Sequence, residues 1–433
     1  MVFGFFGKKK QQEVEEEEEI EPVSFLGPTN GQDVNLKAHA KLVDAGLVAA
    51  KDLVTDALAE RADGLKVEPK GPAYQVTVYV DGIPQSGGKL SKSEGLAVTQ
   101  VLKLVSGLDP KERKTVQSGG IKAEFETKKY ILTVTSTPVP EGERVMMRIN
   151  DQAIKLETLT ELGMGEEMRQ KLRDLSSVPG VVLAAGPPGS GTTTTMYGVM
   201  RNVDAYIYTV YTMIDSGGRK LHHVAPYDDA VQGEDLEASL TRLARREANI
   251  ILIEPMKTAA VAKGAFSKAD LLTLISEMPA KDVASAVHQL VQLVGDPALV
   301  ATHLRAIVTQ KLFRRLCKDC KLAYRPKVDF LKKLGLDESV KTLYRVPPPP
   351  EDPKEDEPCE KCNAVGYRGR VAMFEFLEMT PGMRDIVTAG ADPVAIRAQM
   401  KKEKQTTLQQ DGLRLVAEGV TSLEELQRVF KQA

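Results

Sequence analysis

Eight residues, Gly186-Pro187-Pro188-Gly189-Ser190-Gly191-Thr192-Thr193, have the types and the spacing of a phosphate-binding loop. An apolar run at 181–185 comes before them, and a helix-forming run at 194–200 follows. This strand, turn and helix are the setting that the pattern G-x-x-x-x-G-K-[ST] requires. The glycines let backbone N–H groups surround phosphate oxygens, and the start of the helix adds partial positive charge. The candidate nucleotide-binding residues are Gly186, Gly189, Ser190, Gly191, Thr192, Thr193 and Thr194.

Thr192 stands where the pattern has its lysine. That lysine normally reaches the β- and γ-phosphates, whereas a threonine is too short to do so and carries no charge. Thr193 keeps the hydroxyl that would bind Mg²⁺. Two interpretations therefore stay open. The loop is a retained turn that binds nothing, or it binds ATP and Mg²⁺ weakly.

Acidic residues at the ends of neighbouring strands would complete a site for metal-assisted phosphoryl transfer. Glu254 ends the apolar run 250–253, and Asp215 follows the β-prone run 206–214. We take both as candidate catalytic acids. The alternative is that each is a solvated strand end, because acidic side chains are mostly exposed.

Arginines from a neighbouring domain or subunit often stabilise a transferring phosphate. Arg148 ends a predicted strand, and Arg245 lies on a predicted helix that also carries Arg242 and Arg246. Ordinary surface charge is the alternative for each of them. The five histidines are scattered without ligand spacing, and we assign them no role.

The four cysteines form two close pairs, Cys317-x-x-Cys320 and Cys359-x-x-Cys362. Each pair can place two thiolates on one tetrahedral ion. No secretory signal precedes the pairs, which favours a metal over disulfides. No open ligand position is suggested, so we expect a structural Zn²⁺ rather than a catalytic one. Free thiols and an iron–sulfur cluster are the alternatives.

The composition is that of a globular protein with two or three domains: 433 residues, 42% hydrophobic and 27% charged. A net charge of -2 gives no argument for a nucleic-acid partner. The apolar runs fall short of the ~18–20 residues that a membrane span needs.

The first half of the chain predicts a tail followed by a small domain. Residues 1–35 contain an acidic block at 13–21 and predict a disordered tail. Residues 36–150 predict an α+β domain. Its expected helices are 36–62 and 91–106, and its expected strands are 74–80, 121–125, 130–135 and 144–149.

The second half predicts an α/β domain. Residues 151–180 predict a helical connector with a break at 178–180. From 181 onward, strand and helix patterns alternate, which indicates a largely parallel sheet. One expected strand covers 205–214. Residues 380–433 predict short helices, one of which begins with Thr421 as its cap.

Several further segments are similar to motifs of one family. Residues 61–69, RADGLKVEP, resemble its R-A-S-D-I-H-I-E-P. Residues 80–83, 117–122 and 142–148 resemble R-x-D-G-x, P-Q-D-G-R-I and G-E-K-V-V-L-R. Residues 310–320, QKLFRRLCKDC, are very close to Q-R-L-V-R-R-L-C-x-x-C. The second cysteine pair, with 366–370 and 374–375, matches a zinc-bearing branch. On these motifs the chain resembles the secretion ATPase superfamily: type II secretion and type IV pilus assembly or retraction ATPases.

The resemblance covers roughly residues 36–433 and implies a fold and an assembly. It implies a PAS-like α+β domain at 36–150 and a RecA-like P-loop domain at 181–433, with a four-Cys zinc insertion at 317–370. It also implies a homo- or hetero-hexameric ring in the cytoplasm, peripheral to the inner membrane and docked on the platform of a secretion or pilus system.

The departures from this family fall at its catalytic positions. Its lysine is Thr192, and its E-D-P-I-E box is reduced to Ile214-Asp215-Ser216. Its V-G-E-I-R-D box is replaced by 253–258, where a one-residue shift is needed to make Glu254 the equivalent. Its H-T-N-D box is replaced by 275–278, ISEM, without a histidine. Of its linker arginines Arg148 remains, and Thr133 stands at the earlier position.

These joint losses lead to the hypothesis of a ring subunit that is impaired in ATP hydrolysis and acts as a scaffold or regulatory subunit. One alternative is a divergent, active ATPase in which Lys257 or Arg245 replaces the missing lysine. Another is a zinc-dependent protein-binding module that forms no ring.

Overall fold

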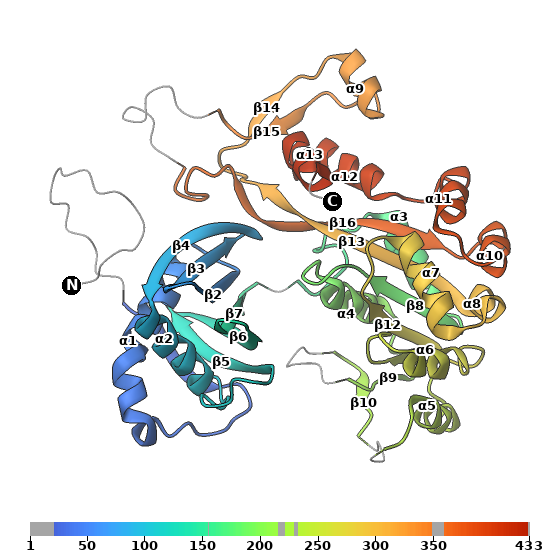
Figure 1. Cartoon of the computed structure of the whole chain (residues 1–433). Coiled ribbons are helices and arrows are strands. Elements are labelled where there is room, and N and C mark those ends of the chain that lie inside the picture. Colours follow the sequence, from blue (N-terminus) through green and yellow to red (C-terminus); the bar gives the residue numbers. More distant parts are fainter. Residues whose placement is uncertain (1–20, 155, 215–220, 229–232, 349–358, 432–433) are drawn as a thin grey trace. The chain divides into compact units, whose positions relative to one another are not determined.

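A computed structural model of the chain describes residues 21–154, 156–214, 221–228, 233–348 and 359–431 (Figure 1). It divides into two compact units, Met1–Lys155 and Leu156–Ala433. The first contains an antiparallel sheet with helices, and the second contains a mostly parallel sheet with helices on both faces. The α/β fold class predicted from the sequence is thereby confirmed. Among the described residues, no helix combines the length and the apolar character needed to cross a membrane.

The first unit is built on a sheet with the strand order β1-β5-β6-β7-β2-β3-β4. Two helices, α1 (Ala40–Ala59) and α2 (Lys92–Val105), pack with the buried strand residues in one core. A 3₁₀ turn, η1 (Leu36–His39), leads into α1. The strands are β1 (Ser24–Pro28), β2 (Gly64–Lys70), β3 (Ala73–Val80), β4 (Ile83–Ser91), β5 (Gln117–Phe125), β6 (Lys128–Val139) and β7 (Gly142–Asp151).

Local patterns explain most of this unit. The alternation in 74–80 predicted β3, whose residues alternate between buried and half-buried along its length. Asp81 and Gly82 form the turn into β4, both with positive φ, of 51° and 77°. Residues 1–20 of the disordered tail predicted at 1–35 lie outside the described residues. The rest of that prediction was wrong, because Ser24–Pro28 form β1, which pairs with β5, and Val23 before it is buried.

The second unit is built on a sheet with the order β10-β9-β11-β12-β8-β13-β16, in which only the β13–β16 pair is antiparallel. Its strands are β8 (Gly180–Ala185), β9 (Val210–Thr212), β10 (Val224–Pro226), β11 (Ile250–Leu252), β12 (Thr273–Met278), β13 (Leu304–Leu316) and β16 (Tyr367–Glu378). The strand before the glycine-rich loop, β8, is therefore central, with β12 on one side and β13 on the other.

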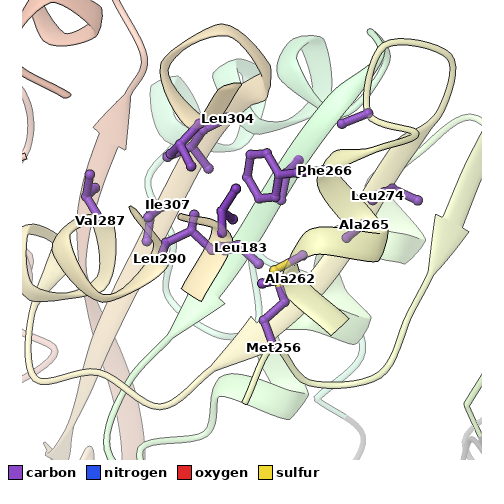
Figure 2. Packing of buried hydrophobic residues seen from close by; sticks show 14 of the residues in the cluster. Leu183, Met256, Ala262, Ala265, Phe266, Leu274, Val287, Leu290, Leu304 and Ile307 are labelled. Carbon is purple, nitrogen blue, oxygen red and sulfur yellow. The ribbon is translucent and has the colours of Figure 1, made fainter. Parts of the chain in front are cut away.

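Helices cover both faces of this sheet. The helices α3 (Glu166–Leu175) and α4 (Thr192–Asn202) bury Leu172 and Met196 against one face. The opposite face carries α5 (Leu236–Arg245), α6 (Ala259–Phe266), α7 (Val283–Val294) and α8 (Pro297–His303). Figure 2 shows Phe266 of α6 and Leu290 of α7 packed near Leu183 of β8.

The remaining elements extend from the edge strands. The strands β14 (Leu322–Tyr324) and β15 (Leu343–Arg345) form a small antiparallel pair, and the connection between them contains α9 (Val328–Leu334). The chain ends in α10 (Pro381–Thr388), α11 (Pro393–Lys402), α12 (Leu408–Ala417) and α13 (Leu423–Lys431). The helix cap predicted at Thr421 was wrong by one residue. Ser422 Oγ accepts the Glu425 N–H at 3.2 Å, while the Thr421 hydroxyl donates to Arg314 O at 2.8 Å.

Two further segments differ from the sequence patterns. The strand expected at 205–214 is only Val210–Thr212, because the Asp204 carboxylate and carbonyl accept the N–H groups of 206–208 and form a turn. Most of the expected connector belongs to the second unit. Leu159, Leu162 and Met164 are buried there in one core with Met168 and the residues of α4.

Candidate functional site

The loop 186–191 connects β8 to α4, as the phosphate-loop pattern predicts. Every residue of β8 is buried, so the strand holds the start of the loop rigidly. Gly189 and Gly191 have φ of 84° and 88°, a conformation that L side chains rarely adopt. The first turn of α4 begins at Thr192, with the N–H groups of a helix start directed at the loop. The backbone therefore has the strand, tight turn and helix start on which phosphate-binding loops are built.

Buried polar atoms lie inside this loop. The Gln310 amide on β13 donates to Ser190 O at 2.7 Å, which leaves its Oε1 buried without a partner among the described residues. Ser190 Oγ is also buried and unpartnered in that part of the chain. A Cβ at Gly186 would lie 2.3 Å from Ser190 Oγ, and one at Gly191 would lie 2.9 Å from Gln310 Nε2. The loop is thus a close-fitting polar turn, which suits an anionic ligand with further acceptor and donor atoms.

Thr192 and Thr193 occupy the first two positions of α4. A Cβ at Gly186 would lie 2.9 Å from Thr192 Cγ2, so the Thr192 side chain lies against the start of the loop and carries no charge into it. Thr193 Oγ1 donates to Glu277 Oε2 at 2.8 Å. Glu277 lies near the carboxyl end of β12, the strand next to β8. Sequence reasoning did not assign Glu277 a role, although it ends an apolar run in the same way as Glu254.

The acids named from the sequence have different positions. Glu254 follows β11, one strand farther from β8, and its side chain is exposed. Its backbone carbonyl accepts the buried Ser276 hydroxyl at 2.7 Å. Lys257 is exposed in the segment after it. Asp215 lies outside the described residues. Glu254 and Asp215 therefore stay predictions, and the carboxylate hydrogen-bonded to Thr193 at the start of α4 is that of Glu277.

Two lysines other than the expected Lys257 follow residues that contact the loop. The Ala280 N–H donates to Gly186 O at 3.3 Å, so Lys281 comes directly after a residue that contacts the loop. Lys311 likewise follows Gln310 on β13. Burial lowers the pKa of the Lys311 ammonium, and the charge of Lys281 lowers it further. Arg245 ends α5 at the amino edge of the parallel strands, whereas the loop follows the carboxyl end of β8.

Arg148 lies in the first unit, on β7. It is exposed, and its cross-strand neighbour on β6 is Thr133, the position at which the resemblance expects a second arginine. The two positions lie side by side on the antiparallel sheet. In this chain the pair therefore keeps one positive charge of the two that the resemblance implies.

The four cysteines come together, as their spacing predicts. All four Sγ atoms lie within 4.8 Å of one another. The Sγ atoms of Cys317 and Cys359 are 4.0 Å apart, and those of Cys320 and Cys362 are 3.6 Å apart. A tetrahedral ion with Zn–S bonds of about 2.3 Å needs sulfurs about 3.8 Å apart, so the arrangement suits such an ion. None of the four is in a disulfide.

The cysteine cluster lies at one end of the long antiparallel pair of β13 and β16, the β13–β16 ribbon. Cys317 comes directly after β13, and the second pair precedes β16, with Leu316 opposite Tyr367 in the register. The Gly366 N–H donates to Cys362 Sγ at 3.3 Å, and Asn363 and Ala364 have positive φ. The Gly366 N–H bond by itself favours the thiolate form of Cys362, which is the form that binds a metal.

Comparisons with known proteins bear on these features. A family model described as type II/IV secretion system protein matches residues 43–428. The chain is 29% identical over 415 residues to the type IV pilus assembly ATPase PilB of Myxococcus xanthus, covering 92% of the chain and 70% of that protein. It is 26% identical to the PilB of Thermus thermophilus, covering 87% of the chain but only 42% of that protein. It is 27% identical to the type II secretion system protein E of Dickeya dadantii, covering 88% and 74%.

Solved structures share the fold. The ATPase DotB of Yersinia pseudotuberculosis superposes with a TM-score of 0.54 at 15% identity, covering 88% of this chain and 93% of that one. The ATPase DotB of Legionella pneumophila gives a TM-score of 0.53 at 14% identity, covering 89% and 96%. The match of the family model extends over nearly the whole chain and includes both units, the glycine-rich loop and the cysteine cluster. The chain therefore belongs to the type II/IV secretion system protein family.

Proposed function

We propose that this protein is a subunit of a secretion or pilus assembly ATPase ring that is impaired in ATP hydrolysis and acts as a scaffold or regulatory subunit. The observation that carries the proposal is Thr192 at the first position of α4. The loop has the backbone of a phosphate site, but this position lacks the cation that would stabilise charge on the transferring phosphate. Loss of one such electrostatic contact costs about 10²–10³ in kcat in other enzymes.

Binding without efficient hydrolysis is consistent with the rest of the loop. The helix start and the buried Ser190 and Gln310 atoms suit a nucleotide phosphate. Thr193 and Glu277 would stand on the metal side of that phosphate. Mg²⁺, when bound, would neutralise part of the negative charge of the phosphates. The chain's own residues would orient the nucleotide and keep it in place.

A structural Zn²⁺ in the cysteine cluster is part of the proposal. It rests on the mutual approach of four sulfurs, which among the described residues form the whole set of grouped ligand atoms. The ion would tie the end of the β13–β16 ribbon together.

Family membership supports a proposal for the assembly and location. We propose a hexamer, pure or mixed with an active relative, at the cytoplasmic side of an inner-membrane platform. The chain spans 42% of the Thermus relative and 70% of the Myxococcus relative, and no nucleic-acid partner is proposed.

ATP turnover and nucleotide affinity of the purified protein with Mg²⁺ test the proposal, beside Thr192→Lys as the matched variant. We expect binding of nucleotide with little or no turnover, and a rise in turnover of about 10²–10³-fold on restoring the cation if Thr192 is the main defect. Turnover of the unaltered protein at the rate of a working pilus ATPase measured in parallel would refute the proposal. Gel filtration tests the ring. A monomer at high concentration would favour the binding-module alternative.

A further inference from the structure

We infer that Glu277 is the metal-positioning carboxylate of this site, acting through the Thr193 hydroxyl, in place of Glu254. The inference deepens the proposed function and rests on nucleotide binding at the loop. Glu277 would help to position the Mg²⁺ that accompanies a nucleoside diphosphate or triphosphate. Glu277 is a positioning residue, because its contact is with Thr193.

The first support is a direct contact. Glu277 Oε2 accepts the Thr193 hydroxyl hydrogen at 2.8 Å, at the second residue of α4. A hydroxyl that donates to a carboxylate turns its oxygen lone pairs away from that carboxylate. The Thr193 oxygen is thereby oriented as a ligand for a cation on its other side. The half-buried carboxylate also adds negative charge, which attracts a divalent cation.

The second support is the strand order. In the parallel register Glu277 lies beside Ala184 of β8, so it stands on the strand next to the loop's own strand. Glu254 follows β11, which is separated from β8 by β12. Neighbouring strands lie about 4.8 Å apart, which puts the β11 backbone roughly 10 Å from β8 and the β12 backbone at half that distance. The side chain of Glu254 is also exposed.

The third support is the direction in which the side chains of β12 point. Ile275 of β12 packs in the same core as Met196 and Tyr197 of α4, whereas Leu274 and Met278 pack in the core on the opposite face. The side-chain period of two in a strand therefore directs residue 277 at α4. The Glu277 carbonyl accepts the Met256 N–H at 2.8 Å, and the Gly186 N–H donates to Met278 O at 3.2 Å. These backbone bonds on both sides hold the carboxylate in its place.

Nucleotide affinity with and without the metal tests the inference. The dissociation constant of ADP is measured by calorimetry for the full-length protein, once with excess Mg²⁺ and once with EDTA. The ratio of the two constants is the metal dependence. We expect Glu277→Gln to reduce this ratio about 10–100-fold, the range found for lost partners of metal ligands. The affinity in EDTA should be unchanged or slightly higher, because a negative charge near the phosphates is removed.

Glu254→Gln is the matched control and should leave the ratio unchanged. Thr193→Val should reduce the ratio as Glu277→Gln does, and the double variant should be no worse than either single one, because the two act as one unit. Glu277→Asp should restore part of the metal dependence of ADP binding, because it keeps a carboxylate at this position. With Mn²⁺ in place of Mg²⁺, electron paramagnetic resonance should show nucleotide-dependent Mn²⁺ binding in the unaltered protein and its loss in Glu277→Gln.

An unchanged ratio of the two constants in Glu277→Gln would overturn the inference, and so would loss of the metal dependence in Glu254→Gln. The measurements are repeated in the Thr192→Lys background, where the phosphates should bind more tightly. If neither background binds ADP, the inference is refuted while a non-hydrolysing subunit remains supported. If the unaltered protein turns over ATP like a working pilus ATPase, the proposed function fails, and the inference is still decided by the ratio.

Discussion

Glu425 gives the sharpest stability prediction in the second unit. It is 1% exposed at the start of α13 and accepts five hydrogen bonds from two arginines. Arg314 donates through its backbone N–H at 3.0 Å, its Nε at 3.0 Å and its Nη2 at 2.7 Å. Arg428 donates through Nε at 2.8 Å and Nη2 at 2.6 Å. Burial alone would raise the pKa of Glu425, but these hydrogen bonds outweigh it and lower the pKa from 4.5 to about 2.

The magnitude follows from this pKa difference. At about 1.36 kcal/mol per pH unit, lowering the pKa from 4.5 to about 2 corresponds to about 3 kcal/mol of folding free energy. The pKa is lower in the folded state, so this contribution is fully present above pH 4.5 and is lost as the pH falls toward 2. Removing one partner of a buried ion pair costs a similar amount, about 3–5 kcal/mol.

Glu425→Gln removes the charge and keeps the shape. Urea unfolding should show a loss of about 3 kcal/mol at pH 7. The difference from the unaltered protein should shrink as the pH is lowered from 4.5 toward 2, because the unaltered Glu425 then becomes neutral as well. Glu424→Gln, at the exposed neighbouring position, should change stability by less than about 0.5 kcal/mol. Equal stability of Glu425→Gln and the unaltered protein at pH 7, or a difference independent of pH, would refute this reasoning.

Three further outcomes are expected. Cys359→Ser should lose bound zinc in metal analysis and unfold at a lower temperature, and unchanged metal content would contradict the zinc assignment. Gly191→Ala should destabilise the protein in urea more than Gly189→Ala, because both have left-handed φ but only Gly191 has a side-chain atom 2.9 Å from the added methyl. Phe266→Ala should cost about 3–5 kcal/mol in urea unfolding, against little for the exposed Phe330→Ala; equal losses would contradict the core packing of Figure 2.

Local patterns predicted the elements that carry their own chemistry. The glycine-rich loop between β8 and α4 was readable because strand, turn and helix are consecutive in the sequence. The cysteine cluster was readable because its two pairs have ligand spacing. The helix expected at 91–106 was readable for the same reason, although its capping box of Ser91 and Glu94 was not predicted.

Long-range order was not readable in the same way. The role of Glu277 depends on β12 lying next to β8, which no single segment encodes. The acid-at-strand-end rule that selected Glu254 applies to Glu277 as well, and applying it evenly would have found both. The strand β1 was missed because its five residues show no clear periodicity of their own. Their hydrogen-bond partners lie in β5, far along the chain.

The strand β13 connects two places that are distant in space. Gln310 donates a hydrogen bond to Ser190 O of the glycine-rich loop, and Cys317 is the first residue of the cysteine cluster. The chain advances seven residues between them, about 23 Å in an extended strand. Gln310 lies on β13 opposite Phe374 of β16, and Cys317 directly follows the last pair of the same ladder, Leu316 opposite Tyr367, so one antiparallel pair of strands joins the two places. The Zn²⁺ proposed for the cysteine cluster would therefore fix one end of the strand that also contacts the glycine-rich loop, and loss of that ion would leave this end of the strand less firmly held.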